Sequence, residues 1–270
     1  MTHPAPTVTS GLGATAGPPC RRLLITAPGT VELIEQILPP LGDHDVYVRT
    51  VVSGISHGTE LAWLHGAAAA LHRTWHTGQR IYLDGPGRDY PVAPGYESIG
   101  RVTQVGPAVT AVAVGDLIAV DAPHADGHRL TDTAAAAGLL PAGVDPEQAV
   151  FFILTRVALG GVHDAALSVG DTAVVVGLGT VGLQAAQIAR RAGARVIGVD
   201  RYPLRVEAAG STKRSAAYAS AAGSPPSPPT ATRGHLGQDQ ADAGGTFLQR
   251  GQSEHLRCRS CCYPWSAVSQ

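Results

Sequence analysis

The chain has 270 residues, of which 44% are hydrophobic and 15% charged, and its formal net charge is -1. A nearly neutral surface argues against nucleic acid or an anionic membrane as the main partner, because both favour basic proteins. The sequence shows no secretory signal and no apolar run long enough to span a membrane, so we expect a soluble, cytoplasmic protein.

The first half of the chain is rich in β-forming residues. Residues 1–20, mostly Thr, Pro, Gly and Ala, are predicted to form a disordered leader. Four short β-rich runs follow, with Pro-Gly, Pro-Pro and Gly-Asp turn signals among them; they are Leu23–Thr26, Val46–Val52, Ile99–Val105 and Leu117–Val120. Short strands at this spacing predict a compact, β-barrel-like domain over residues 21–144.

The hydrophobic pattern then changes to alternating helices and strands, which predicts an α/β domain over residues 145–210. Residues 145–169 are predicted to form one helix with Pro146 in its first turn. The apolar strand DTAVVVG, the helix TVGLQAAQIARRAG and the second strand RVIGVD then form a βαβ unit. Part of a further helix is expected over Pro203–Ala209.

A glycine-rich motif opens the helix of this unit. It has the form G-x-G-x-x-G and reads Gly177-Leu178-Gly179-Thr180-Val181-Gly182. Gly177 permits the tight turn, Gly179 lets the backbone approach a pyrophosphate, and Gly182 allows the helix to pack closely on the strand. Because the helix N-terminus also presents free N–H groups, the motif predicts a dinucleotide-binding loop.

An acidic residue supports the same prediction. Asp200 ends the second strand, 18 residues after Gly182, where a carboxylate binds the ribose 2′-OH of the cofactor. We therefore expect NAD, since the 2′-phosphate of NADP would meet a like charge. Arg201 and Arg205 lie close enough to keep NADP open as the alternative.

The order of these motifs resembles the medium-chain dehydrogenase/reductase family, and the zinc-type alcohol dehydrogenases in particular. The matching stretches are APGTVELIEQILPPLGDHDVYVRTVVSGISHGTE, YPVAPGYESIGRVTQVGPAVTAVAVGDLIAV and LSVGDTAVVVGLGTVGLQAAQIARRAGARVIGVD. The resemblance covers residues 21–210. It implies a GroES-like catalytic domain, a Rossmann domain and an NAD(P)-dependent oxidoreductase that acts on a small alcohol or carbonyl substrate.

The metal site of the zinc-type relatives is altered in this sequence. Those relatives place a cysteine in GIC-GTD and a histidine in GHE, whereas this chain has GISHGTE and GYE. Ser56 or His57 stands at the cysteine position and Tyr96 at the histidine position, while Glu97 matches the family. Since serine and tyrosine are poor zinc ligands, we favour a site without zinc; a bound ion would take His57, Glu97 or His124.

Hydride transfer without zinc requires a proton donor beside the carbonyl group. By resemblance Thr59 matches the family's proton-relay hydroxyl, and His57 or Tyr96 could supply the proton. The alternative for Thr59 is a turn hydroxyl bonded to its own backbone. The nearby stretch HGAAAALHRTWHTGQRIYL is predicted either to shape a substrate pocket or to form a surface flap.

The pattern ends abruptly after Gly210. The last 60 residues contain only five of Leu, Ile, Val and Phe, too few for a folded core. Residues 211–270 are therefore either a disordered tail or a segment in another reading frame than the body, and we favour the second. The competing functional interpretation is a non-catalytic remnant with at most weak nucleotide binding, and the oligomeric state stays open.

Overall fold

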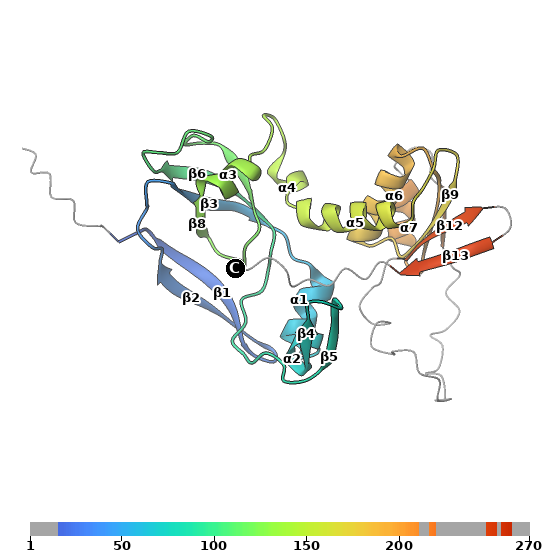
Figure 1. Ribbon diagram of the computed structural model, residues 1–270, viewed down its shortest axis with the longest axis horizontal. Helices are drawn as coiled ribbons and strands as arrows, with labels where there is room; N and C mark the ends of the chain where they lie inside the picture. Colours follow the sequence, from blue (N-terminus) through green and yellow to red (C-terminus); the bar gives the residue numbers. More distant parts are fainter. Residues whose placement is uncertain (1–15, 211–215, 220–246, 253–254, 261–270) are drawn as a thin grey trace, which may run out of the picture. The chain divides into compact units, whose positions relative to one another are not determined.

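The computed structural model describes residues 16–210, 216–219, 247–252 and 255–260 (Figure 1). The chain divides into two compact units, Met1–Ile55 with Tyr90–Val150, and Ser56–Asp89 with Phe151–Gln270. Within the described ranges, no helix is long and apolar enough to cross a membrane.

The first unit is built on a four-stranded antiparallel sheet. Its order is β7-β6-β3-β8, formed by Leu117–Val120, Ser98–Val105, Asp45–Ser53 and Gly127–Thr131. A second ribbon pairs β1 (Pro19–Ala27) with β2 (Thr30–Ile37). Two short helices, α3 (Asp132–Ala137) and α4 (Pro146–Ala149), complete the unit.

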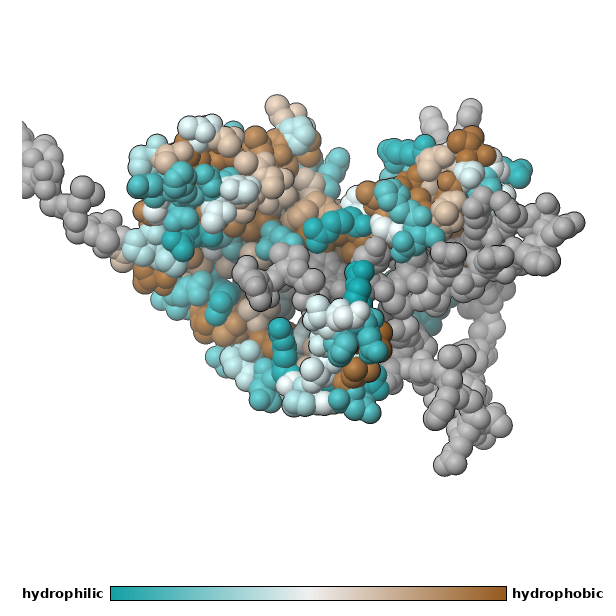
Figure 2. All heavy atoms as spheres, in the orientation of Figure 1, coloured by the Kyte–Doolittle hydropathy of each residue, from teal (hydrophilic) through white to brown (hydrophobic). Residues whose placement is uncertain are grey.

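Strand β3 is covered on both faces over Val46–Val48, which explains why these three successive residues are hydrophobic. Val46 and Val48 pack in one cluster with residues of β6 and β7, while Tyr47 on the opposite face packs with Cys20 and Leu38. All of these side chains are buried. The β1–β2 ribbon differs, because hydrophobic residues reach the surface over it (Figure 2); they are Val31, Leu33 and Ile37.

The second unit contains the predicted βαβ unit. The parallel strands β9 (Thr172–Val176) and β10 (Arg195–Asp200) flank α6 (Thr180–Arg191), and α7 (Pro203–Gly210) leads to a third parallel strand, β11 (Ala216–Ala219). The order β11-β10-β9 is that of one half of a doubly wound sheet. Helix α5 (Phe152–Asp164) packs on α6.

Small side chains bring these two helices and the sheet close together. The core of this unit is rich in alanine and holds Ala158 of α5, Ala185 and Ala189 of α6, and Val175 of β9. Because alanine has no side chain beyond Cβ, elements that meet through it approach closely. The glycine-rich loop between β9 and α6 is therefore set on a closely packed base.

The single helix predicted over residues 145–169 is wrong in extent. The structure has α4 and α5 instead, separated by Val150 and Phe151. Helix α5 ends at Asp164, and Ala166 then adopts a left-handed conformation with φ of 49°, which an α-helix cannot contain. In the sequence, hydrophobic residues continue past Asp164, which favoured a longer helix. In the structure, however, Val169 is 86% exposed and belongs to no helix.

Three short strands lie in the range predicted to be a tail. Besides β11, these are β12 (Phe247–Gln252), antiparallel to β9, and β13 (His255–Ser260), antiparallel to β12. The rest of that range and residues 1–15 lie outside the described residues, so the predicted tail and leader stay predictions. The doubly wound fold would place a parallel strand beside β9.

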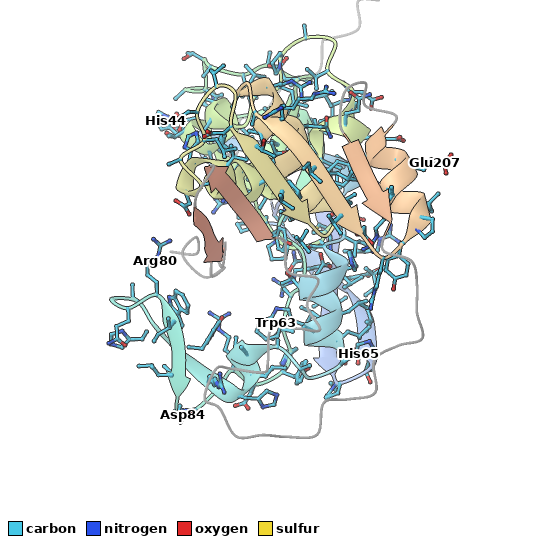
Figure 3. The ribbon with its side chains drawn as sticks, turned by 90° about the vertical axis from the view of Figure 1, so that its right-hand side faces the viewer. His44, Trp63, His65, Arg80, Asp84 and Glu207 are labelled. Atoms are coloured by element: carbon cyan, nitrogen blue, oxygen red, sulfur yellow. The ribbon has the colours of Figure 1, made fainter. Side chains whose placement is uncertain are left out.

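Residues 57–84, which follow strand β3, form two short helices and a hairpin of their own. Helices α1 (His57–Leu64) and α2 (Ala69–His72) precede a hairpin of β4 (Arg73–His76) and β5 (Ile81–Asp84). Figure 3 shows Arg80 and Asp84 at opposite ends of this hairpin. Trp75 and Tyr82 are paired across it, edge to face, with ring centroids 5.1 Å apart.

Candidate active site

The glycine-rich loop has the geometry that its sequence predicts. Gly177 adopts a φ of +89°, which favours glycine, and its N–H donates to the carbonyl oxygen of Val199, 2.8 Å away. A Cβ atom on Gly182 would overlap the Gly177 carbonyl oxygen. These two glycines are therefore required by the fold of the loop itself.

Gly179 has a different role from its two partners. It is the N-cap of α6, has ordinary extended backbone angles, and would place a Cβ atom in open space with no neighbour within 4 Å. The first N–H groups of a helix lack intrahelical acceptors, so those near Thr180 and Val181 can bind an anion. Gly179 thus leaves room for a phosphate at the helix N-terminus.

Asp200 fixes this loop from the neighbouring strand. Its side chain is buried, and its carboxylate accepts hydrogen bonds from the backbone N–H groups of Leu178 at 2.7 Å and Tyr202 at 2.9 Å. Burial by itself raises the pKa of the Asp200 carboxyl, but these two bonds and the Arg205 guanidinium outweigh it, so that the pKa lies below its ordinary value. The carboxylate is therefore held ionised next to the loop.

An aromatic ring organises the two arginines that follow. Tyr202 has the Arg201 guanidinium 4.9 Å from its ring centroid and the Arg205 guanidinium 4.7 Å from it. Arg205 also contacts the Asp200 carboxylate at 3.5 Å, whereas Arg201 is exposed. Sequence reasoning missed Tyr202, although its place between two arginines and beside the acid is a visible signal.

The candidate metal ligands do not form a metal site. Among the residues that the structure describes, no three His, Cys, Asp or Glu side chains come together in a way that could hold a metal ion. His57 is exposed in the first turn of α1, and Tyr96 is half-buried. Glu97 is 1% exposed and its carboxylate lies against the backbone of Gly54. The donor set therefore does not fit zinc.

The structure places Thr59 and His57 together in the first turn of α1, where Thr59 is half-buried. The N-cap of this helix is Ser56, whose N–H donates to the buried Glu60 carboxylate at 2.8 Å. The sequence offered a turn only as the alternative for Thr59 and did not predict this helix. The catalytic roles of Thr59, His57 and Tyr96 stay predictions.

A second polar group lies beside Tyr96 and Glu97 in the first unit. The Nδ1 atom of His124 is 2.5 Å from the Ser53 hydroxyl, which is 3.3 Å from the Glu97 carbonyl oxygen. Sequence reasoning considered His124 only as a metal ligand and missed Ser53. No local signal could find this pair, because 71 residues separate its members.

Comparisons with known proteins agree with this architecture. Residues 42–144 match the alcohol dehydrogenase GroES-like domain. The chain is 30% identical over 205 residues to the D-guloside 3-dehydrogenase of Escherichia coli K12. This match covers 70% of this chain and 56% of that protein. It is 28% identical over 208 residues to the D-xylulose reductase A of Aspergillus oryzae, covering 66% and 54%. The chain thus spans about half the length of the curated relatives it matches.

Solved structures share the fold. A short chain alcohol dehydrogenase from Escherichia coli CFT073, complexed with NADH, has a TM-score of 0.57 at 19% identity, over 75% of this chain and 63% of that one. Galactitol-1-phosphate dehydrogenase from Escherichia coli has a TM-score of 0.56 at 20% identity, over 73% and 60%. A GroES-like domain followed by a Rossmann-type βαβ unit defines the class of dehydrogenase folds. Within that class, residues 42–144 match the GroES-like domain of alcohol dehydrogenases, and the relatives support the resemblance to the medium-chain dehydrogenase/reductase family.

Proposed function

We propose that this chain acts as an NAD(P)-dependent oxidoreductase on a secondary alcohol or carbonyl group of a sugar or polyol. The observation that supports this most is the glycine-rich loop tied to Asp200, with open space at Gly179 where a pyrophosphate would lie. The substrate class follows from the relatives, which are named for a guloside and for xylulose.

NAD is the proposed cofactor, with NADP as the alternative. Gly177, Gly179 and Gly182 would admit the pyrophosphate, and the Asp200 carboxylate would accept a hydrogen bond from the ribose 2′-OH. Exposed Arg201 would be the cation for a 2′-phosphate, since Arg205 already contacts Asp200. When bound, the nicotinamide ring supplies the hydride acceptor or donor.

On the substrate side, Thr59, His57 and Tyr96 remain the proposed proton-handling residues. Each carries a group that can donate or accept a proton, and none requires a metal. We derive no step through zinc, because the described donor groups do not fit it.

A specific observation favours a second candidate, a nucleotide-binding protein without catalysis. The nicotinamide half of the cofactor binds where a doubly wound sheet reverses its strand order, next to the strand that here is β9. In this chain the neighbour on that side is the antiparallel strand β12, and the pairing extends to Val176, the last residue of β9. Such a sheet would support the adenosine half alone.

The test is a fluorescence titration of the full chain with NADH and NADPH, followed by turnover with a panel of sugars and polyols. We expect NADH to bind at least about tenfold more tightly than NADPH, because one uncompensated like charge is worth about 1.4 kcal/mol or more. Arg201→Ala should weaken NADPH binding and leave NADH binding unchanged.

The outcomes of this test separate the candidates. Binding with turnover supports the oxidoreductase. Binding of NADH and of ADP-ribose with equal affinity, without turnover of any substrate, supports the second candidate. Absence of nucleotide binding would contradict both.

A further inference from the structure

Tyr202 and two arginines lie at the end of β10, beside the carboxylate proposed to bind the ribose of the cofactor. We propose that Tyr202 is a specificity-determining residue: its ring positions Arg201 for the 2′-phosphate of NADP, so that the site admits NADP, although more weakly than NAD. This inference rests on the proposed function and deepens its cofactor assignment. All of the residues involved belong to the second compact unit.

The backbone fixes the position of Tyr202. Its N–H donates to the Asp200 carboxylate at 2.9 Å. Its carbonyl oxygen accepts from the N–H groups of Arg205 at 3.0 Å and Val206 at 3.3 Å, at the start of α7. Because Tyr202 contributes only main-chain atoms to these bonds, a substitution of its side chain leaves them in place.

The ring of Tyr202 lies next to two cations. The guanidinium carbon of Arg201 is 4.9 Å from the ring centroid and that of Arg205 is 4.7 Å from it. Both distances are within the range of about 6 Å at which an aromatic ring attracts a cation. Since Tyr202 is 45% exposed and Arg201 is exposed, the ring restricts a long side chain that would otherwise sample many rotamers in water.

The charged side chains around the ring have a positive excess. The ionised Asp200 carboxylate is buried, and the Arg205 guanidinium approaches it to 3.5 Å. Together with Arg201, the set consists of one carboxylate and two guanidinium groups, so that one positive charge remains. Asp200 by itself would repel a 2′-phosphate, but the three side chains together attract it.

The two arginines differ in what holds them. Arg205 contacts both the ring and the Asp200 carboxylate, whereas Arg201 contacts the ring. A cation–π contact attracts the guanidinium through its charge and needs none of its N–H donors for hydrogen bonds. Arg201 can therefore donate to phosphate oxygens while the ring holds its side chain. A phosphate that meets an ordered side chain avoids the entropy cost of ordering it, which strengthens binding.

Two pairs of ligands isolate the contribution of the 2′-phosphate. NADPH differs from NADH only in this phosphate, and adenosine 2′,5′-bisphosphate differs from 5′-AMP in the same way. We define the specificity ratio as the Kd of the 2′-phosphorylated ligand divided by the Kd of its partner. Contacts with the part that both ligands share cancel in this ratio. A purely structural defect in a variant would change both Kd values and leave the specificity ratio unaltered.

The first experiment titrates the full chain with the four ligands, by fluorescence for NADH and NADPH and by calorimetry for the adenosine nucleotides. Tyr202→Ala should raise the specificity ratio about two- to tenfold, because the phosphate must then order a mobile Arg201 side chain. Tyr202→Phe keeps the ring and should retain the wild-type ratio. The matched control is Leu204→Ala, at a residue of α7 that is 77% exposed, which should leave the ratio unchanged.

The second experiment is a double-mutant cycle that tests whether Tyr202 acts through Arg201. Arg201→Ala alone should raise the specificity ratio about tenfold or more, since a hydrogen bond to a charged group is lost. In the Arg201→Ala background, Tyr202→Ala should change the ratio by less than about twofold, the range within which independent effects add. An undiminished effect of Tyr202→Ala in that background would overturn the proposal.

The outcomes separate this inference from the proposed function. A specificity ratio that rises in Tyr202→Ala and not in Tyr202→Phe supports the inference, even where only the adenosine nucleotides bind and no substrate is turned over. If the ratio in Tyr202→Ala equals or falls below that of the wild type, Tyr202 does not position Arg201, although the proposed cofactor site stands. If the wild-type chain binds none of the four ligands, the proposed function fails and the inference fails with it.

Discussion

At the scale of single residues, the buried histidine His128 shows how one side chain links stability to pH. Its side chain is 8% exposed, and within the described residues its Nε2 atom has no hydrogen-bond partner. Burial lowers its pKa from 6.5 to about 4. Because the folded pKa is depressed, the unfolded chain takes up a proton first as the pH falls, and stability present above pH 6.5 is lost progressively down to pH 4.

We expect the free energy of unfolding to fall by about 3 kcal/mol between pH 7.5 and pH 4 on account of His128. Urea unfolding across this range, compared between the wild type and His128→Gln, measures the contribution. The free energy of unfolding of the variant should depend less on pH than that of the wild type. Parallel curves for the two proteins would mean that His128 does not cause the loss of stability at low pH. His163→Gln, a substitution at an exposed histidine at the end of α5, is the control.

At the scale of elements, the loop between β9 and α6 separates the glycines that its fold requires from the glycine proposed to leave room for a phosphate. Gly182 meets the Gly177 carbonyl oxygen, while Gly179 faces open space. The sequence motif treats the three glycines alike. The structure distinguishes them because a Cβ atom has a different neighbour at each position.

This difference predicts opposite effects of two alanine substitutions. Gly182→Ala should destabilise the chain by about 3 kcal/mol, because the methyl group overlaps backbone that cannot move away. Gly179→Ala should cost about 1 kcal/mol or less, yet weaken NADH binding by about tenfold by filling the phosphate space. Urea unfolding and NADH titration of both variants check this, and equal effects on stability would contradict it.

The β-rich half was harder to predict at this scale. The runs Val46–Val52, Ile99–Val105 and Leu117–Val120 lie in β3, β6 and β7, because a strand buried on one or both faces leaves a clear apolar signal. Strands β2 and β8 were not predicted, since both are short of buried apolar residues and are held by pairing with partners distant in sequence.

At the scale of the whole molecule, each compact unit has its own hydrophobic core. The alanine-rich cluster around Val175 and Leu178 belongs to the second unit, and the cluster around Val48 and Ile118 to the first. Since a ligand stabilises only the structure that forms its site, nucleotide binding should act on the two cores unequally.

Native-state hydrogen exchange with and without NADH tests this expectation. At a free NADH concentration 100 times the Kd, amides of β9, β10 and α6 should exchange up to about 100-fold more slowly, while those of β3 and β6 should change little. Equal slowing in both units would show that they unfold as one body.

The sequence by itself determined the βαβ unit, its glycine-rich loop and the position of Asp200 at the end of the second strand, because their signals are local: an apolar strand, a glycine motif and a helix period within about 30 residues. Only the tertiary structure decided the rest. It joined Ser53 to His124 across 71 residues and set the antiparallel β12 beside β9. Such contacts depend on which strands pair, and pairing between distant segments leaves no periodic trace in either one.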